Sequence, residues 1–458
     1  MSAPASVQAA VAAGHPATAA AGAEILAEGG TAADAAVAMA LASCVAETVM
    51  TGLLGGGHAI WWDGRRAAAL DCFVDVPGRS GALVDLAVPF GEDVVQYAIG
   101  PASCAVPGLP AGLDALWRAG GRMPWPRLVE PALRLARDGV PMPPAHAACL
   151  AMLAPVMTLG RGAKVYAPGG AVLTEGEALR QPGLVDALGV LASEGAASVY
   201  RGTLAEALVA VEGVVVSAGD LRRYRARWRR PAREEYHGVH VETRAGLSGV
   251  PELLGGLPRL RGRTPTERVL ALVAALDGAG PESHTTNLVA VDAAGRACVL
   301  TSSLGLGSGD WLPGFDLHLN SMLGERDLVV GELVAGERME SMMAPTLAFD
   351  ADGLALAIGS AGGTRLRTAL VSVLAGILDE GLAPQAAVDR PRAHPGADAV
   401  HAEPGVDAAA LAQLEAQGRT VRRWPGLHHY FGGVSCVGRG GPAGDPRRSG
   451  AAVAMGPP

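Results

Sequence analysis

Two adjacent threonines, Thr285 and Thr286, are the residues of this 458-residue chain whose type and position best suit chemistry. They open a run rich in β-branched residues that reads as a strand. A threonine hydroxyl is a poor nucleophile unless a base lies beside it, and cutting the chain just before the threonine frees an α-amine that can serve as this base. Used in this way, Thr285 predicts a self-cleaving hydrolase or acyltransferase. The alternative is that the pair simply favours a strand.

A glycine pair offers a second catalytic element. Gly362 and Gly363 lie between a strand-like run and a helical pattern, where backbone N–H groups point outward and bind anions. Glycine also lets a substrate approach the backbone closely. We therefore predict an oxyanion hole at Gly362 and Gly363, with an ordinary tight turn as the alternative.

Other kinds of site are not expected. The glycine-rich stretch 305–309 lacks the GxGxxG spacing and is followed by no clear helix, and no GK[ST] motif occurs. The histidines show no HExxH or comparable spacing, so no metal and no cofactor is predicted. Six scattered cysteines form no CxxC motif, which indicates reduced thiols.

Composition narrows the class of protein. Hydrophobic residues make up 49% of the chain, charged residues 18%, and the net charge is −8, which argues against disorder and against a nucleic-acid partner. The N-terminal residues lack the basic start and apolar core of a signal peptide, and no uncharged apolar run reaches membrane-spanning length. We expect a soluble, cytoplasmic protein that acts on a small molecule and binds neither nucleic acid nor membrane.

The hydrophobic pattern predicts an α+β protein. Helices are expected within 18–45 (broken at Gly29 and Gly30), at 109–117, 128–138, 266–276 and 364–378, and through much of 144–213. Strands are expected at 58–62, 67–73, 287–292, 297–303, 346–350 and 354–358. The Arg-rich stretch 221–228 is interpreted as a solvated helix face. Helices, strands, strands and helices in this order predict a four-layer αββα sandwich.

Several motifs together resemble the γ-glutamyltransferase family, a branch of the N-terminal-nucleophile (Ntn) hydrolases. The matching segments, in chain order, are Gly14-His15-Pro16, the run 29–36 (GGTAADAA), Gly55-Gly56-Gly57, Val106-Pro107-Gly108, the run 133–139 (LRLARDG), Asp220-Leu221 with Tyr224, the run 359–365 (GSAGGTR) and Asp445-Pro446-Arg447-Arg448. The resemblance runs from near residue 14 to the end and implies the αββα fold.

The resemblance also implies a processing site and catalytic roles. Thr285 would attack the carbonyl of His284, and water would then release a large subunit, 1–284, and a small subunit, 285–458, which remain one domain. Thr285 would afterwards be the nucleophile, with Ser303 orienting its hydroxyl. Gly362 and Gly363 match the oxyanion-hole glycines of the family.

The substrate-binding positions depart from the family. Phe73 stands where the family has the arginine that clamps the substrate α-carboxylate, and phenylalanine cannot make that charged contact. The family's paired serines become Ser341 and Met342, and Asn287 replaces the histidine that follows its two threonines. The family's asparagine, glutamine or glutamate, and aspartate fall on Gly305, Ser321 and Gly324.

These departures favour an altered substrate. The preferred hypothesis is a self-cleaving threonine hydrolase that forms an acyl-enzyme with a non-glutamyl metabolite. Some family members in actinobacterial antibiotic biosynthesis hydrolyse a C–C bond beside a carbonyl, in routes to 4-alkyl-proline units, which makes that reaction one form of this hypothesis. A second hypothesis is a genuine γ-glutamyl hydrolase or transferase with a rearranged clamp, built on Arg365 or Arg367. A third is an unprocessed relative that binds a ligand without catalysis.

Overall fold

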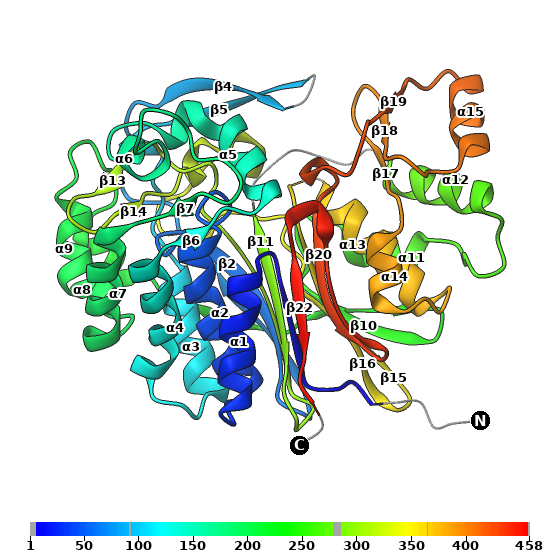
Figure 1. The fold of residues 1–458 in the computed structure, drawn as a ribbon, viewed down its shortest axis with the longest axis horizontal. Helices are drawn as coiled ribbons and strands as arrows, with labels where there is room; N and C mark the ends of the chain where they lie inside the picture. The colour runs from blue at the N-terminus through cyan, green and yellow to red at the C-terminus, as the bar shows by residue number, and fades with distance from the viewer. Residues whose placement is uncertain (1–5, 91–92, 278–284, 364, 457–458) are drawn as a thin grey trace.

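Two antiparallel β-sheets lie face to face in the middle of the molecule, with helices on the outer side of each (Figure 1). The computed structural model describes residues 6–90, 93–277, 285–363 and 365–456. Four layers result: helices, sheet, sheet, helices. The predicted α+β αββα sandwich is confirmed.

The first sheet contains seven strands among the described residues, and each pairs antiparallel with its neighbours. In order across the sheet they are β22 (Ala451–Ala454), β1 (Ala10–Ala13), β11 (Thr286–Val291), β12 (Ala297–Ser303), β2 (Gly56–Trp62), β3 (Ala67–Cys72) and β8 (Arg227–Arg229). The first and last strands of the chain thus lie side by side. The sequence predicted the four strands β2, β3, β11 and β12.

The second sheet contains six strands among the same residues, again antiparallel. Their order is β21 (Gly441–Gly444), β20 (Gly433–Gly438), β16 (Gly353–Ala361), β15 (Thr346–Asp350), β10 (Val239–Thr243) and β9 (Ala232–Tyr236). Residues before and after position 285 contribute strands to both sheets. A cut before Thr285 would therefore leave two interleaved pieces.

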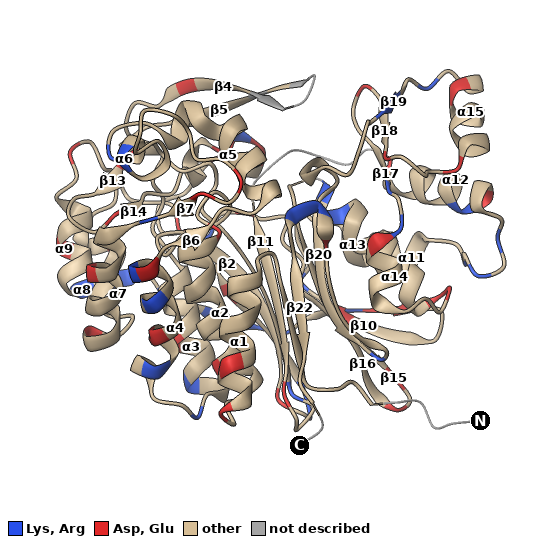
Figure 2. Ribbon diagram, in the orientation of Figure 1, with Lys and Arg blue, Asp and Glu red and all other residues tan. Residues whose placement is uncertain are grey.

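An apolar layer fills the space between the sheets. Its buried members are Ala10, Ala12, Ile60, Val289, Val291, Ala297, Val299, Leu347, Ala357 and Val437. The central strands β11, β12, β16 and β20 carry no charged residue, and Figure 2 shows the charges gathered instead on the helices, loops and strand ends. Burial of this layer holds the two sheets together.

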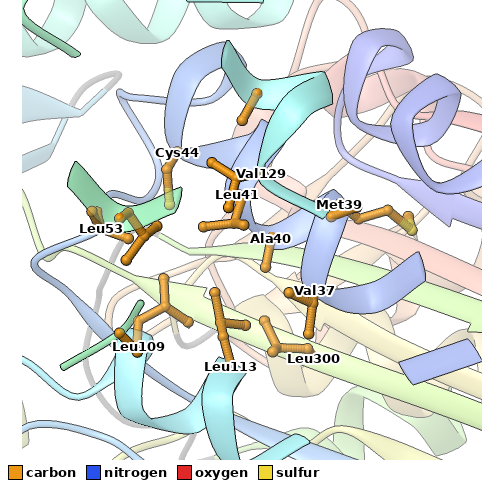
Figure 3. Close-up of a cluster of buried hydrophobic side chains, with 14 of the residues drawn as sticks. Val37, Met39, Ala40, Leu41, Cys44, Leu53, Leu109, Leu113, Val129 and Leu300 are labelled. Atoms are coloured by element: carbon orange, nitrogen blue, oxygen red, sulfur yellow. The ribbon is translucent and has the colours of Figure 1, made fainter. Parts of the chain in front are cut away.

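Two alanine-rich helices, α1 (Pro16–Ala27) and α2 (Ala32–Ala46), cover the first sheet. Every residue of α2 is buried, because the small side chains let neighbouring helices and β11 approach closely. Figure 3 shows side chains of α2 with Leu113 of α3 (Leu109–Gly120) and Leu300 of β12 in one apolar cluster. Thr31 caps α2 and exchanges hydrogen bonds with Asp34, and the two residues form a capping box.

The other helices extend the two outer layers of the sandwich (Figure 1). They are α4 (Trp125–Asp138), α5 (Pro144–Met157), α6 (Gly162–Tyr166), α7 (Pro182–Glu194), α8 (Ser198–Arg201), α9 (Thr203–Val209), α10 (Ala218–Arg223), α11 (Val250–Gly256), α12 (Pro265–Leu276), α13 (Arg365–Leu378), α14 (Pro384–Asp389) and α15 (Ala408–Ala416). Helix α13 packs on β16 and β20, and α14 packs on β21.

Short strands decorate the sandwich. They are β4 (Val84–Phe90) with β5 (Asp93–Ile99), β6 (Val140–Pro141) with β7 (Ala178–Leu179), β13 (Trp311–Leu312) with β14 (Leu317–His318), and the three-stranded set β17 (Ala393–Pro395), β18 (Val400–Ala402) and β19 (Val421–Arg423). No helix in the described part of the chain is long and apolar enough to span a membrane. The six cysteines are buried and free, as predicted.

The interpretation of the Arg-rich stretch was wrong in part. Helix α10 ends at Arg223, and the stretch continues as β8, which pairs Leu70 of β3 with Trp228. Arg227 is partly buried and Arg229 is exposed, and their charge alone suggested a solvated helix. Edge pairing with β3 decides the conformation instead.

Candidate active site

Thr285 lies directly before β11, one of the central strands of the first sheet, and is almost completely buried. Side chains alternate along a strand. Val289 belongs to the layer between the sheets, whereas Leu288 belongs to the cluster under the helices. Thr285 therefore faces the second sheet and Thr286 faces the helices. His284 lies outside the described residues.

The glycine turn of the second sheet meets the Thr285 hydroxyl. Gly362 follows β16, and its backbone N–H donates a hydrogen bond to Thr285 Oγ1 over 3.3 Å. Gly362 and Gly363 have backbone φ angles of 128° and 60°, which residues other than glycine rarely adopt. A Cβ on Gly362 would also come within 2.8 Å of the Gly432 Cα. The structure thus brings Thr285 and Gly362 together, in the arrangement expected of a nucleophile and an oxyanion donor.

Gly362→Ala is expected to displace this turn. The added methyl group is strained by φ and blocked by the backbone of Gly432, so the N–H must move away from Thr285. Loss of one oxyanion donor typically lowers kcat by about 100-fold or more. Steady-state kinetics would measure the loss. Gly353→Ala, at an open hairpin turn with φ of 104°, is the matched control for strain alone.

Ser303 ends β12, next to β11. The register pairs Asn287 with Thr301 and Thr286 with Ser302, so one further step sets Ser303 opposite Thr285. The buried Ser303 hydroxyl accepts a hydrogen bond from Gly305 N–H at 2.9 Å. Its position fits the orienting role that the resemblance implies.

Asn287 joins the two sheets. Its Oδ1 accepts a hydrogen bond from Thr301 at 2.8 Å, and its Nδ2 lies 3.5 Å from the Ser435 carbonyl oxygen of β20. The side chain fills the space above Gly359, where any Cβ would overlap it. Asn287 is thus occupied by contacts within the protein.

The positions of the missing clamp are apolar. Phe73 is fully buried and shares one cluster with Met342, together with Met322, Met339 and Met343. The ring of Phe73 also stacks on His58, with ring centroids 5.6 Å apart. The structure therefore places Phe73 and Met342 in one apolar cluster.

Ser341 and Ser321 are buried within loops. The Ser341 carbonyl oxygen accepts a hydrogen bond from Arg244 Nη1 at 2.7 Å, and its hydroxyl accepts one from Met343 N–H at 3.2 Å. Ser321 packs against Gly305, where a Cβ would come within 2.6 Å of the Ser321 hydroxyl. Gly305 also has a φ of 70°, which disfavours any residue with a side chain. The asparagine that the family has at this position would therefore not fit here.

Arg365 contacts an aromatic ring. Its Nε donates a hydrogen bond to the Tyr430 carbonyl oxygen at 3.0 Å, and its guanidinium lies 4.7 Å from the centroid of the Tyr430 ring. The side chain is 2% exposed. These contacts hold α13 to η4 (His429–Phe431), a role that is structural in character.

Two charged residues behind the threonine pair were not predicted as site residues. Glu47 Oε2 accepts a hydrogen bond from the Thr286 hydroxyl, and Arg448 Nη1 donates one to the Thr285 carbonyl oxygen at 3.1 Å. Arg448 was noted only as part of a family motif. Glu47 is the first acidic residue after the long apolar helix α2, which is the signal that could have drawn attention to it.

No group of three or more His, Cys, Asp or Glu side chains in the described ranges is arranged to hold a metal ion. The groups that the structure places at Thr285 are its own hydroxyl, the backbone N–H of Gly362 and nearby polar side chains. That combination suits acyl transfer.

A threonine at the start of a central strand, facing a glycine turn across an αββα sandwich, defines an Ntn hydrolase fold. Solved structures agree: cephalosporin acylase from Bacillus halodurans superposes with a TM-score of 0.84 at 23% identity, covering 99% of this chain and 96% of the other. The family model of gamma-glutamyltranspeptidase matches residues 18–256 and 261–455. The chain belongs to this family.

Two relatives show the range of names within the family. Acylase ACY 1 proenzyme of Pseudomonas sp. (strain V22) is 27% identical, over 92% of this chain and 88% of its own length. Glutathione hydrolase proenzyme of Bacillus subtilis (strain 168) is 25% identical, over 89% and 84%. The protein is accordingly an enzyme, a hydrolase or acyltransferase of the γ-glutamyltransferase type, and the hypothesis of a non-catalytic binding relative is set aside.

Proposed function

We propose that this protein is a self-processing threonine acyl hydrolase whose nucleophile is Thr285. The hydrogen bond from Gly362 N–H to Thr285 Oγ1, 3.3 Å long, carries the proposal. The same N–H is suited to donate a hydrogen bond to a substrate oxygen on which negative charge develops when Thr285 Oγ1 attacks a carbonyl beside it. Gly363 and the start of α13 add a positive helix end near that oxygen.

Self-processing would proceed by an N-to-O acyl shift. Thr285 Oγ1 attacks the carbonyl carbon of His284, its proton passes to the departing Thr285 nitrogen, and an ester links the two residues. Water hydrolyses the ester and leaves a carboxylate on His284 and a free α-amine on Thr285. The products, 1–284 and 285–458, remain associated because each supplies strands to both sheets.

The freed amine is the base for turnover. It takes the proton of Thr285 Oγ1, which attacks the substrate carbonyl, and the proton then passes to the leaving group. Water releases the acyl group and restores Thr285. Ser303 follows Ser302, which pairs with Thr286, and so lies opposite Thr285. We propose that Ser303 orients the Thr285 hydroxyl.

We further propose an acyl group that carries no glutamate-type ammonium and carboxylate. Phe73 and Met342 fill the clamp positions within one apolar cluster, and neither side chain can pair with a substrate carboxylate or ammonium group. Similarity to acylases supports this choice. The same acyl-enzyme serves whether the leaving group is an amine or, as in C–C bond hydrolysis for 4-alkyl-proline biosynthesis, a stabilised carbanion.

A γ-glutamyl substrate is the second candidate, and similarity to glutathione hydrolases favours it. It requires another cation in place of the missing arginine. Arg365 is already bound to Tyr430, so on our proposal Arg365→Ala lowers thermal stability, whereas a clamp role would raise KM for γ-glutamyl anilide with stability retained.

A panel of acyl donors tests the substrate class. The purified processed enzyme is given hexanoyl, phenylacetyl and γ-glutamyl p-nitroanilides, and a β-diketone whose cleavage releases a stabilised carbanion. We expect kcat/KM for the best uncharged donor to exceed that for the γ-glutamyl compound at least tenfold. Burying the charged groups of a γ-glutamyl substrate without partners costs more than about 1.4 kcal/mol, which corresponds to about a factor of ten. The reverse order would overturn the substrate assignment while leaving the nucleophile intact.

A further inference from the structure

A pocket with buried polar side chains borders both threonines at the start of β11 and also reaches Gly433 of the second sheet. The pocket there is lined by Gly14, Glu47, Thr286 and Arg448, with His146 of α5. None of these residues takes part in the acyl transfer described above. Gly14 and Glu47 contact Thr286, and Arg448 contacts Thr285.

Glu47 is held at the end of α2 by two hydroxyl groups. Thr18 of α1 donates a hydrogen bond to its Oε1 at 2.6 Å, and Thr286 donates one to its Oε2. Gly14 leaves room for the carboxylate, because a Cβ there would come within 2.6 Å of Oε2 and 3.0 Å of the Thr286 hydroxyl. The side chain is 1% exposed. A carboxylate so placed, with both oxygens accepting, fixes the direction of the Thr286 side chain.

Arg448 fixes the backbone of the preceding residue. Its Nη1 lies 3.1 Å from the Thr285 carbonyl oxygen and 3.4 Å from Met50 Sδ, and its Nη2 lies 3.4 Å from the His429 carbonyl oxygen. Each of these partners is uncharged. A fully desolvated guanidinium that spends its donors on neutral groups is costly, so its position calls for a function.

We propose that Glu47 and Arg448 are positioning residues for the nucleophile, the first holding the Thr286 hydroxyl and the second holding the Thr285 carbonyl. Together they fix the peptide unit between the two threonines, Glu47 from the helix side of β11 and Arg448 from beside the Gly362 turn. The orientation of this peptide unit sets the directions of the Thr285 hydroxyl and α-amine. This inference rests on the proposed nucleophile and adds to it.

The surroundings make Glu47 the group that titrates near neutrality. Burial raises the pKa of Glu47 to about 7, although its hydroxyl partners and the charge of Arg448 work in the opposite direction. Burial lowers the pKa of His15 to about 4 and that of His146 to about 3, and burial raises the pKa of the Cys44 thiol. With these pKa values, His15, His146 and Cys44 stay neutral between pH 5 and 9. Burial lowers the pKa of Arg448 only to about 10, so Arg448 stays charged over the same range.

Protonation of Glu47 would loosen the threonine pair. A neutral carboxyl group has one acceptor oxygen fewer and one donor more, so it cannot hold both hydroxyl groups in the same way. We expect kcat of the wild-type enzyme to fall as pH drops below about 7, in addition to the effect of protonating the Thr285 α-amine.

Matched variants test the positioning role. Thr286→Val removes the hydroxyl and keeps the shape, Thr286→Ser keeps the hydroxyl, and Glu47→Gln removes the charge. We expect Thr286→Val and Glu47→Gln to lower kcat roughly 10- to 100-fold with KM little changed, since small misplacement of reacting groups costs this much. Thr286→Ser should recover most of the rate. The Glu47→Gln pH profile should lose the ionisation near 7, a change that a purely structural residue would not produce.

The control is Thr51→Val, which removes a buried hydroxyl that pairs with Ser302 at 2.9 Å on the same side of the sheet. Its kcat should stay within threefold of wild type. Melting curves establish that each variant is folded, and self-cleavage is followed in parallel on gels. Wild-type kcat and an unchanged pH profile in both Thr286→Val and Glu47→Gln would overturn the positioning role and leave the Thr285 nucleophile standing. Retained cleavage and turnover in Thr285→Ala would instead remove the proposed function itself.

Discussion

Thr285→Ala should leave the purified chain as one polypeptide of 46.3 kDa. The wild-type protein should instead give two bands of roughly 29 and 17 kDa, at about 0.1 kDa per residue. Alanine has neither the oxygen that attacks the His284 carbonyl nor the oxygen that later carries the acyl group, so both reactions stop together. Intact-mass analysis would locate the cut between His284 and Thr285.

Thr285→Ser is the matched control, because it keeps both the oxygen and the α-amine. It should still cleave itself, more slowly, and retain measurable turnover. Loss of a nucleophile of this kind lowers kcat by about 1,000-fold or more, so turnover by Thr285→Ala should be close to background. A wild-type protein that stays intact, yet hydrolyses acyl donors at rates equal to those of Thr285→Ala, would contradict the assignment.

Much of the sandwich follows from local sequence pattern. The hairpin of β11 and β12 has alternating β-branched residues on both sides of a tight turn, and β12 has the predicted bounds 297–303. The capping box at Thr31 and Asp34 marks the start of α2 in the sequence. Signals of this sort are contained within a few residues, so they survive folding unchanged.

The edges of the sheets could not be predicted in this way. Strand β1 is Ala-Val-Ala-Ala and β22 is Ala-Ala-Val-Ala, sequences that favour a helix at least as much as a strand. They are strands because they pair with each other and β1 pairs with β11, contacts between residues hundreds of positions apart. Tertiary pairing overrides local propensity here.

The residues of the site also fall into those that local sequence predicts and those that only the fold reveals. Thr285 and the pair Gly362 and Gly363 lie in local patterns, and the structure brings Thr285 and Gly362 into contact. Glu47 and Arg448 come from segments about 400 residues apart, and their local signals, an acidic residue after an apolar helix and a family motif, do not show that the two residues meet. Only the fold shows that both contact the threonine pair.

A buried ion network beneath the site should have a large effect on stability. Arg447 binds Glu403 through two hydrogen bonds, of 2.5 and 2.6 Å, and lies 3.2 Å from Asp445. Arg392 binds Asp445 at 2.6 Å. All four side chains are at most 2% exposed. Removing one partner of such a pair leaves an uncompensated buried charge.

Glu403→Gln is expected to lower the free energy of unfolding by about 3–5 kcal/mol, since two buried guanidinium groups, Arg392 and Arg447, are then left with the single carboxylate of Asp445. Denaturant unfolding measures the change. Glu415→Gln is the matched control: Glu415 binds Arg423 at 2.6 Å, but both side chains are about half exposed, so its loss should leave the denaturant midpoint close to that of the wild type. Equal midpoints for Glu403→Gln and wild type would contradict the importance of the network.

The network also predicts acid sensitivity. Burial works to raise the pKa of Asp445, but the guanidinium groups of Arg392 and Arg447 outweigh it and hold that pKa below the ordinary value. A carboxylate with a lowered pKa in the folded state contributes stability above the unfolded pKa of about 3.9, and this contribution is lost as pH falls further. Asp445→Asn should therefore be less stable than wild type at pH 7, and the difference should shrink as pH falls below about 4.

The consequences should reach the active site. Arg392 donates hydrogen bonds to the carbonyl oxygens of Phe431 and Gly432, and Gly432 is the residue that bounds the Gly362 turn. Arg448, which holds the Thr285 carbonyl, directly follows Arg447. Glu403→Gln should thus lower kcat at temperatures where the variant is still folded, whereas Glu415→Gln should not. If Glu403→Gln keeps the wild-type kcat while losing stability, the network supports the fold alone and does not hold the Gly362 turn in place.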